Sequence, residues 1–119
     1  MEMPELDDSQ GAVHIDYTNI KTYTRTHTKW TFVDEADVIP GKSARGKKLA
    51  SLLDWYFELH FPGDPVMPGV LIMEFIMMTG ALILTTLPEK NHLEFLFRGC
   101  DNLRFYREVR PGDILTNEV

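Results

Sequence analysis

Hydrophobic side chains fill a long segment in the second half of the chain. Residues 70–87 contain a single charged side chain, Glu74, and Pro88 follows directly. Because proline ends a helix and the segment is apolar on every face, the pattern predicts one buried helix over about residues 69–87. A membrane span is a poorer interpretation, since the apolar run is short and a carboxylate at mid-bilayer costs about 2.5–3.5 kcal/mol.

Before this helix, polar and apolar side chains alternate, which is typical of strands. Threonines at positions 22, 24, 26 and 28 alternate with larger side chains, and we predict a strand over residues 28–38. The turn residues Pro40-Gly41-Lys42 then favour a hairpin whose second strand lies within residues 44–53.

Residues 54–69 differ from their neighbours, because three prolines and two glycines fall between Pro62 and Gly69. No helix or central strand tolerates that proline density, so we predict a rigid loop. After the helix we predict strands over residues 93–98 and 102–109, a turn at Pro111-Gly112-Asp113 and a last strand over residues 114–119. One buried helix surrounded by strands is an α+β arrangement.

Composition narrows the class of protein. The chain has 119 residues, of which 44% are hydrophobic, enough for one domain with its own core. A net charge of −6 argues against a nucleic-acid partner, and the single cysteine, Cys100, excludes a disulfide framework and fits a reducing, cytoplasmic setting. Five acids lie within residues 2–16, and residues 1–10 lack the apolar run of a signal peptide. We expect an acidic leader over residues 1–27, with 13–23 as a candidate extra strand, and a folded domain over residues 28–119.

Three residues around the proline-rich loop carry candidate chemistry. His60 opens the loop and is either a base or a packing residue. Glu74 lies in the apolar helix, where a carboxylate needs a partner or a raised pKa, so it is either a functional acid or a structural acceptor. Gly69 lies where the helix begins, and its N–H either polarises a thioester carbonyl or merely accompanies a tight turn. Together, a base, an acid and a carbonyl-binding amide suit α-proton abstraction with loss or gain of a β-hydroxyl.

The sequence from His60 to Glu74, HFPGDPVMPGVLIME, resembles the signature of the β-hydroxyacyl-(acyl carrier protein) dehydratases of bacterial fatty-acid synthesis, the FabZ/FabA-like family. Residues 99–105 and 111–113 downstream, and 33–34 and 40–42 upstream, are similar to further landmarks of that family. The resemblance extends from about Thr31 to the C-terminus, and the fourteen-residue separation of His60 and Glu74 matches the family.

This resemblance implies a hotdog fold, in which an antiparallel sheet wraps around the long helix, and a homodimer or a trimer of dimers with shared active sites. It implies that His60 of one subunit is the catalytic base, that Glu74 of the other protonates or orients the departing hydroxyl, and that Gly69 binds the thioester carbonyl. The substrate would be a 3-hydroxyacyl chain on the phosphopantetheine of an acyl carrier protein or CoA, dehydrated to a trans-2-enoyl thioester. No metal, redox cofactor or membrane is expected.

Two larger sets of residues complete the expected site. The acyl tunnel is expected to be lined by Phe61, Val66, Met67, Met73, Met77 and Met78. Acidic carrier proteins bind basic patches, and the candidates form two clusters: Lys42, Arg45, Lys47 and Lys48, and Arg98, Arg104, Arg107 and Arg110. A solvated strand face explains each cluster equally well.

Departures from the family pattern leave alternatives open. Leu59 stands where the family usually has glycine, Met78 where it usually has a supporting glutamine, and residues 24–32 replace its usual His-Arg-Tyr-Pro segment. The alternatives are another hotdog enzyme, such as a thioesterase or enoyl hydratase, and a non-catalytic acyl-binding module. Since family members continue through further strands, we expect either a C-terminally incomplete domain or a replacement strand from residues 13–23.

Overall fold

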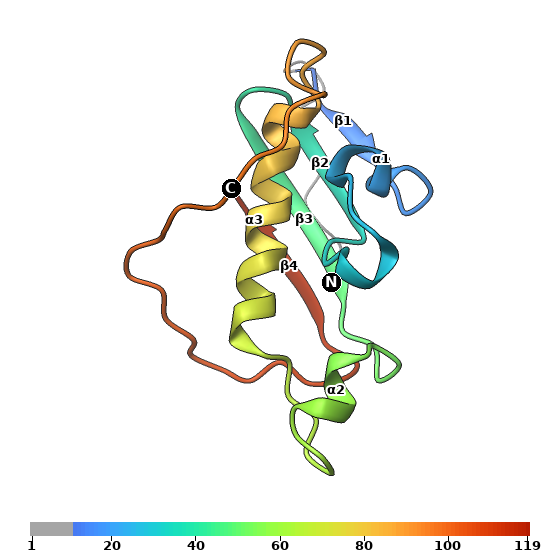
Figure 1. The fold of residues 1–119 in the computed structure, drawn as a ribbon, viewed down its shortest axis with the longest axis vertical. Helices are drawn as coiled ribbons and strands as arrows, with labels where there is room; N and C mark the ends of the chain where they lie inside the picture. Colours follow the sequence, from blue (N-terminus) through green and yellow to red (C-terminus); the bar gives the residue numbers. More distant parts are fainter. Residues whose placement is uncertain (1–10) are drawn as a thin grey trace.

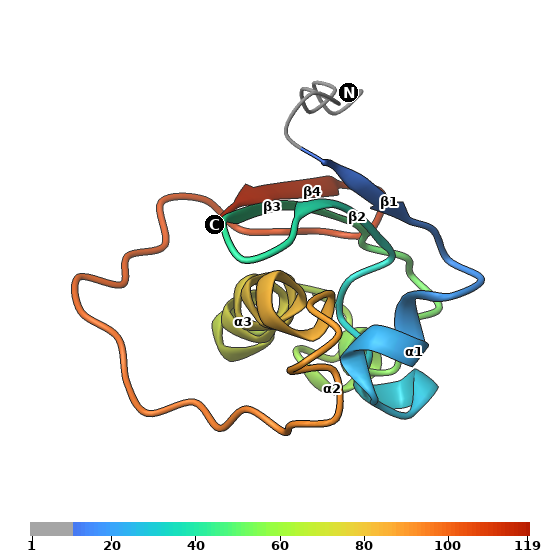
Figure 2. The ribbon, with the colours of Figure 1, turned by 90° about the horizontal axis from the view of Figure 1, so that it is seen from above.

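The computed structural model describes residues 11–119, so most of the strongly acidic part of the predicted leader lies outside the described residues. Figures 1 and 2 show two layers, a four-stranded antiparallel sheet and one long helix, α3 (Gly69–Thr85), along one of its faces. Two short helices, α1 (Ile20–Thr24) and α2 (Tyr56–Leu59), lie to one side of α3 (Figure 2). This is the α+β hotdog arrangement that the sequence predicts.

The strands of the sheet follow one another in chain order, and every neighbouring pair is antiparallel. They are β1 (Val13–Ile15), β2 (Glu35–Ile39), β3 (Ser43–Leu49) and β4 (Ile114–Glu118). The predicted turn over residues 40–42 joins β2 to β3 with Gly41 at φ 77°, a conformation that favours glycine. Before β4, the Asp113 carboxylate accepts the N–H of Arg110 at 2.9 Å and shapes the predicted turn. The hairpin and the last strand are therefore confirmed.

The predicted strand over residues 28–38 is wrong in its first half. Thr28–Trp30 form a 3-10 helix, and β2 begins only at Glu35. The hydroxyls of Thr26 and Thr31 lie 2.7 Å apart, and Thr31 Oγ1 donates to the His27 carbonyl at 2.8 Å. Because these hydroxyls bond locally, the alternating threonines stabilise a compact turn instead of a strand.

Helix α3 confirms the predicted helix and ends at Thr85, two residues before the expected end. Its buried positions are Leu71, Phe75, Met78, Thr79, Leu82 and Thr85. The expectation that the helix is buried on every side is wrong for the single chain, because Val70 is 64% and Ile76 is 38% exposed. Within residues 11–119, the side of α3 that faces away from the sheet is only partly covered.

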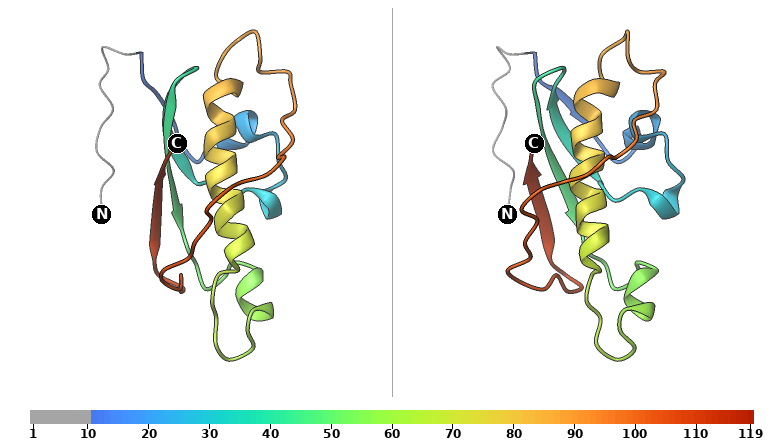
Figure 3. Two further views of the ribbon diagram at one scale, coloured as in Figure 1. Left: turned by 90° about the vertical axis from the view of Figure 1, so that its left-hand side faces the viewer. Right: turned by 60° about the vertical axis from the view of Figure 1, so that its left-hand side comes forward.

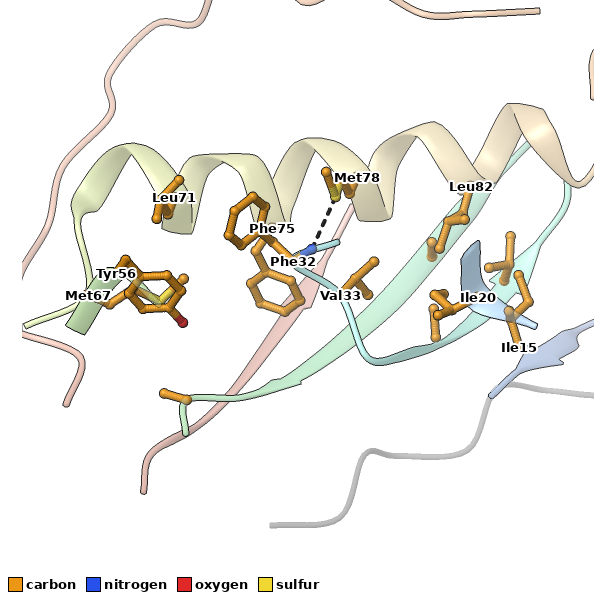
Figure 4. Close-up of a cluster of buried hydrophobic side chains, with 14 of the residues drawn as sticks. Ile15, Ile20, Phe32, Val33, Tyr56, Met67, Leu71, Phe75, Met78 and Leu82 are labelled. Atoms are coloured by element: carbon orange, nitrogen blue, oxygen red, sulfur yellow. Dashed lines mark hydrogen bonds between the residues drawn. The ribbon is translucent and has the colours of Figure 1, made fainter. Parts of the chain in front are cut away.

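The core lies between α3 and the sheet, as Figure 4 shows. Phe75 and Met78 of α3 meet Phe32 from the segment before β2, and the Phe32 N–H donates to Met78 Sδ at 3.3 Å. Ile15 and Ile20 extend the core at the Leu82 end of the helix (Figure 4). Burial of each such side chain contributes about 1.5–3 kcal/mol, so this cluster holds the helix on the sheet.

Helix α3 crosses β3 at a very close contact. A Cβ on Gly46 would lie 2.2 Å from Thr79 Oγ1, so only glycine permits this approach. Asn117 of β4 bridges the two elements, because its Oδ1 accepts the Gly46 N–H at 3.2 Å and its Nδ2 donates to Thr79 Oγ1 at 3.0 Å. This contact sets the height of α3 above the sheet.

Residues 88–113 connect α3 to β4 without a helix or strand, so the predicted strands over residues 93–98 and 102–109 are wrong. Figures 2 and 3 show this connection as a wide arc that leaves α3 and returns to the sheet. A strand needs a neighbour for its N–H and C=O groups, and these segments pair with no strand of residues 11–119. Their apolar side chains are left exposed, Leu96 at 88% and Tyr106 at 90%. None of the helices in the described part is long and apolar enough to cross a membrane.

Candidate active site

The loop predicted over residues 54–69 lies between β3 and the start of α3 (Figure 1). It is not irregular throughout, because Tyr56–Leu59 form the single turn of α2 before the first proline of the loop is reached. Beyond α2 the loop closes on itself, since the N–H groups of Phe61 and Asp64 each donate to the other residue's carbonyl at 2.9 Å. The Met67 N–H donates to the Val109 carbonyl at 2.9 Å, which anchors the loop to the chain before β4.

His60 follows α2, and its ring is fixed by its own loop. The ring Nδ1 lies 2.9 Å from the carbonyl oxygen of Val66. Because a carbonyl only accepts, Nδ1 carries the proton, and Nε2 of the neutral ring keeps a free lone pair. The imidazole also stacks on Phe61, with ring centroids 3.9 Å apart. Nε2 is therefore the nitrogen that can act as a base.

Two neighbouring features, the leucine before His60 and the ion pairs at the tip of its loop, are compatible with this position of the ring. Leu59, which stands at the family's usual glycine, ends α2 without a left-handed φ, so the side chain introduces no backbone strain. At the tip of the loop, Arg110 Nη1 donates to Asp64 at 2.8 Å and Arg110 Nη2 to Glu108 at 2.6 Å. The bond to Asp64, followed by that to Glu108, raises the pKa of Arg110 above its ordinary value.

Gly69 begins α3 and shares a cavity with His60. This cavity has a volume of about 300 Å³, and its lining includes His60, Met67, Gly69 and Phe105. The first N–H groups of a helix lack intrahelical partners and lie at the positive end of its dipole, and the Gly69 N–H donates no hydrogen bond within residues 11–119. A Cβ on Gly69 would lie 2.8 Å from the Phe105 ring. The structure thus puts a base and an unbonded amide in one cavity.

Glu74 lines a different cavity of about 500 Å³, between α3, the region of α1 and residues 93–97. Its side chain is partly exposed and has no hydrogen-bond or ion-pair partner among residues 11–119. The carboxylate is therefore less buried than the apolar helix predicted. Within one chain, His60 and Glu74 do not line a common cavity.

The predicted tunnel residues divide between the two cavities. Val66 and Met67 line the cavity of His60, whereas Met77 and Met78 line that of Glu74. Phe61 and Met73 line neither of the two. Within residues 11–119 of one chain, the predicted tunnel residues therefore form two separate pairs, one in each cavity, and no continuous tunnel joins them.

The predicted basic patch of β3 is wrong for Lys48, which is only 4% exposed. Side chains alternate along a strand, so Lys48 lies on the same side of β3 as the buried Ala44, towards α3. Arg45 and Lys47 lie on the opposite side, where Arg45 Nε is 2.9 Å from Glu118 and Lys47 Nζ is 3.6 Å from Glu35. The remaining predicted cations are exposed at Lys42, Arg98, Arg104 and Arg107, and Arg110 holds the loop tip.

Sequence reasoning missed a polar cluster next to α2 that consists of Lys48, Asp54 and Tyr56. Lys48 Nζ lies 3.6 Å from Asp54 Oδ2, and the same oxygen accepts the Tyr56 hydroxyl at 2.8 Å. The period of two along β3, with small residues at 44 and 46, was the signal that could have placed Lys48 inward. Among residues 11–119, no three His, Cys, Asp or Glu side chains are grouped so that they could hold a metal ion.

Comparison with known proteins identifies the family of the chain. The FabA-like domain family matches residues 26–119. The 3-hydroxyacyl-[acyl-carrier-protein] dehydratase FabZ of Moorella thermoacetica is 51% identical over 83 residues, which cover 70% of this chain and 58% of that protein. The FabZ of Ligilactobacillus salivarius is 40% identical over 106 residues, which cover 88% of this chain and 76% of that protein.

A third relative extends the match. The FabZ of Caulobacter vibrioides is 37% identical over 118 residues, 95% of this chain and 74% of that protein. The chain spans little more than half the length of the Moorella relative. The match of residues 26–119 covers most of the sequence, and the chain belongs to the FabA-like domain family, the family of the FabZ dehydratases.

Proposed function

We propose that the chain, as a homodimer, dehydrates 3-hydroxyacyl thioesters carried on an acyl carrier protein to trans-2-enoyl thioesters in fatty-acid or related lipid biosynthesis. The observation that carries this proposal is that one cavity is lined by both His60, whose Nδ1 is bonded so that Nε2 is free, and Gly69, whose helix-start N–H is unbonded. The names of the relatives, 3-hydroxyacyl-[acyl-carrier-protein] dehydratase, support the same chemistry. The single cysteine and the carrier-bound substrate favour a cytoplasmic location.

In the proposed reaction, Nε2 of His60 removes the proton from C2 of the acyl chain. The Gly69 N–H stabilises the negative charge that develops on the thioester oxygen. The C3–O bond then breaks and the C2–C3 double bond forms. The departing hydroxyl takes a proton either from the carboxylic acid of Glu74 of the partner subunit, or from the protonated His60 ring while Glu74 orients it, and leaves as water. No metal or redox cofactor takes part in these steps.

The placement of Glu74 supports a site shared between two chains. His60 and Glu74 line separate cavities of one chain, and the Glu74 carboxylate has no partner within residues 11–119. The partly uncovered side of α3 that carries Val70 and Ile76 gives a second copy an apolar surface to bury. A homodimer, or a trimer of such dimers, brings the two residues to one substrate.

The carrier protein is expected to bind exposed cations, of which Arg107 lines the cavity of His60 and Gly69. Lys42, Arg98, Arg104 and Arg107 are exposed, whereas Lys48 is buried and Arg45 and Lys47 face acids across the sheet. Because acidic carriers are attracted over long range, the KM for a carrier-bound substrate should rise with salt, while the KM for a pantetheine-bound one should stay constant.

The direct test is turnover by the purified chain. We expect 3-hydroxyacyl thioesters of several chain lengths, on pantetheine, CoA or carrier protein, to give the enoyl product. His60→Ala and Glu74→Gln should abolish it, whereas His92→Ala and Glu89→Gln, at exposed positions, should not. Release of a free thiol would indicate a thioesterase, and tight binding of the acyl carrier without product would indicate a non-catalytic module. Absence of turnover on every substrate would overturn the proposal.

A mixing experiment tests the shared site. His60→Ala and Glu74→Gln chains are inactive alone but form one intact site in each mixed dimer. Random mixing should therefore restore about a quarter of wild-type activity, because half of the dimers are mixed and one of their two sites is intact. A mixture without activity, from chains that are active when unmutated, would place both residues in one chain.

A further inference from the structure

The most unusual charged side chain outside the proposed catalytic residues is that of Lys48. It is the only buried charged residue among residues 11–119, at 4% exposure, and it lies near the end of β3. A buried ammonium needs a counter-charge and further acceptors. Lys48 Nζ lies 3.6 Å from the Asp54 carboxylate and donates to the Leu49 carbonyl at 3.4 Å. The ion pair therefore ties β3 to the turn that leads into α2.

Asp54 collects three partners on one oxygen, Oδ2. Besides Lys48, this oxygen accepts the Ser51 N–H at 3.1 Å and the Tyr56 hydroxyl at 2.8 Å. The Asp54 N–H returns a hydrogen bond to the Ser51 carbonyl at 2.9 Å, which closes the turn. A single carboxylate thus holds the end of β3, the turn after it and the first residue of α2.

Tyr56 connects Asp54 to His60, the proposed base, through a backbone hydrogen bond. Its carbonyl accepts the His60 N–H at 3.0 Å, across the single turn of α2. Four residues do not form a stable helix alone, so α2 depends on what holds Tyr56. Burial, followed by the bond to Asp54, raises the pKa of the Tyr56 hydroxyl well above its ordinary value. The hydroxyl therefore remains a protonated donor to Asp54 at every working pH.

We propose that Asp54 is a positioning residue for His60: its carboxylate fixes Tyr56, and through α2 it fixes the backbone from which the imidazole reaches the Val66 carbonyl. Every step of this path is a contact between neighbours, Lys48 to Asp54, Asp54 to Tyr56, and Tyr56 to His60. The inference rests on the proposed function only in taking His60 as the base.

The test is Asp54→Asn, which keeps the shape of the side chain and removes its charge. The matched control is Asp37→Asn, because the Asp37 carboxylate also lies at hydrogen-bond distance from a side-chain nitrogen, His14 Nδ1 at 2.7 Å, and its side chain is 24% exposed against 26% for Asp54. Two readouts are needed, kcat and KM for a 3-hydroxyacyl pantetheine thioester, and the ¹⁵N NMR signals of the His60 ring, which report whether Nδ1 carries the proton.

For Asp54→Asn we expect kcat to fall by about tenfold or more with KM unchanged within about twofold, since a misplaced catalytic group loses rate before it loses binding. The His60 ring should lose its fixed Nδ1–H tautomer. Asp37→Asn should change neither quantity. Tyr56→Phe, which removes only one hydroxyl, should act in the same direction as Asp54→Asn, and it decides the question if Asp54→Asn does not fold.

Unchanged kcat and an unchanged His60 spectrum in folded Asp54→Asn would overturn the proposal. Lower thermal stability or lower kcat with an unchanged His60 spectrum would also overturn it, because Asp54 would then act as an ordinary structural residue. The NMR readout needs no turnover. If the wild-type chain has no dehydratase activity, the proposed function fails, and the His60 spectrum still decides whether Asp54 positions the ring.

Discussion

The contact between Gly46 and Thr79 offers the sharpest test of how the helix is held on the sheet. In Gly46→Ala, the new methyl group would lie 2.2 Å from Thr79 Oγ1 and 2.9 Å from Thr79 Cγ2. Normal contact between such atoms is about 3.5 Å, so α3 must retreat from β3 by roughly 1 Å. Overpacking of this kind costs about 1–3 kcal/mol. Retreat of the helix also stretches the bond from Asn117 to Thr79, worth about 1 kcal/mol.

We therefore expect Gly46→Ala to lower the free energy of unfolding by about 2–4 kcal/mol, a large share of the 5–15 kcal/mol typical of a domain. The measurement is urea unfolding with linear extrapolation, in which the midpoint should fall while the slope stays constant. Gly99→Ala is the matched control, because a Cβ there has no neighbour within 4 Å and the φ of Gly99 is not left-handed. Its effect should stay within about 0.5 kcal/mol.

A double-mutant cycle separates the collision from a general loss of packing. Thr79→Ala removes the two atoms that the new methyl meets most closely and leaves a contact of 3.1 Å to Cβ. Alone it should destabilise, because Asn117 loses an acceptor. Combined with Gly46→Ala, it should recover more than about 1 kcal/mol relative to the sum of the single changes. Additive effects, or a Gly46→Ala chain as stable as wild type, would refute the close contact.

Three further predictions follow from the site. Because the pKa of Tyr56 is raised in the folded state, its contribution to stability is complete below about pH 10 and is lost as the pH rises beyond it, by about 1.4 kcal/mol per pH unit. Urea unfolding at a series of pH values should show this loss in the wild-type chain but not in Tyr56→Phe. Equal slopes of the free energy of unfolding against pH in the two chains would contradict the prediction. Gly69→Ala should lower kcat by about tenfold, because the new methyl group would lie 2.8 Å from the Phe105 ring. Adding Phe105→Ala to the same chain should restore part of the rate. If the rate does not recover, the collision with Phe105 is not the cause of the loss. Arg110→Ala should speed amide hydrogen exchange at Asp64 while the melting temperature changes little, since both side chains are exposed; unchanged exchange would show that the ion pair does not order the loop tip.

The elements that the sequence predicts well are those whose cause lies within the element. Helix α3 needs only an uninterrupted apolar segment and a terminating proline, and the β2–β3 hairpin needs only the turn at Gly41. The strand pattern over residues 102–109 is equally clear, yet those residues form no strand. An alternation of polar and apolar side chains indicates which residues can be buried on one face of a strand. A strand also needs a neighbouring backbone with which to pair, and this segment has no such neighbour among residues 11–119.

In the candidate site, too, local sequence predicts some features and only the fold reveals the others. The sequence motif predicts that His60 is a site residue. The structure shows in addition that its Nδ1 is bonded to the Val66 carbonyl, which leaves Nε2 as the free ring nitrogen. The run of cations predicts Lys48 on the surface, whereas the register of β3 directs its side chain towards α3. Its partner Asp54 follows six residues later, beyond the end of the strand. No local pattern links a strand residue to a turn residue, so this contact could only be found once the fold was known.

Met78, which stands where the family usually has a glutamine, makes a polar contact of its own in the core. From the sequence, a methionine in place of the usual glutamine is expected to remove polar support near the site. In the structure, Met78 is 8% exposed and its Sδ accepts the N–H of Phe32 at 3.3 Å (Figure 4). A thioether is a weak acceptor, yet it bonds the Phe32 N–H and fills the core between α3 and Phe32. The substitution therefore leaves the fold intact and changes the polarity of the cavity wall beside Glu74, which is where an effect on the acyl chain should be sought.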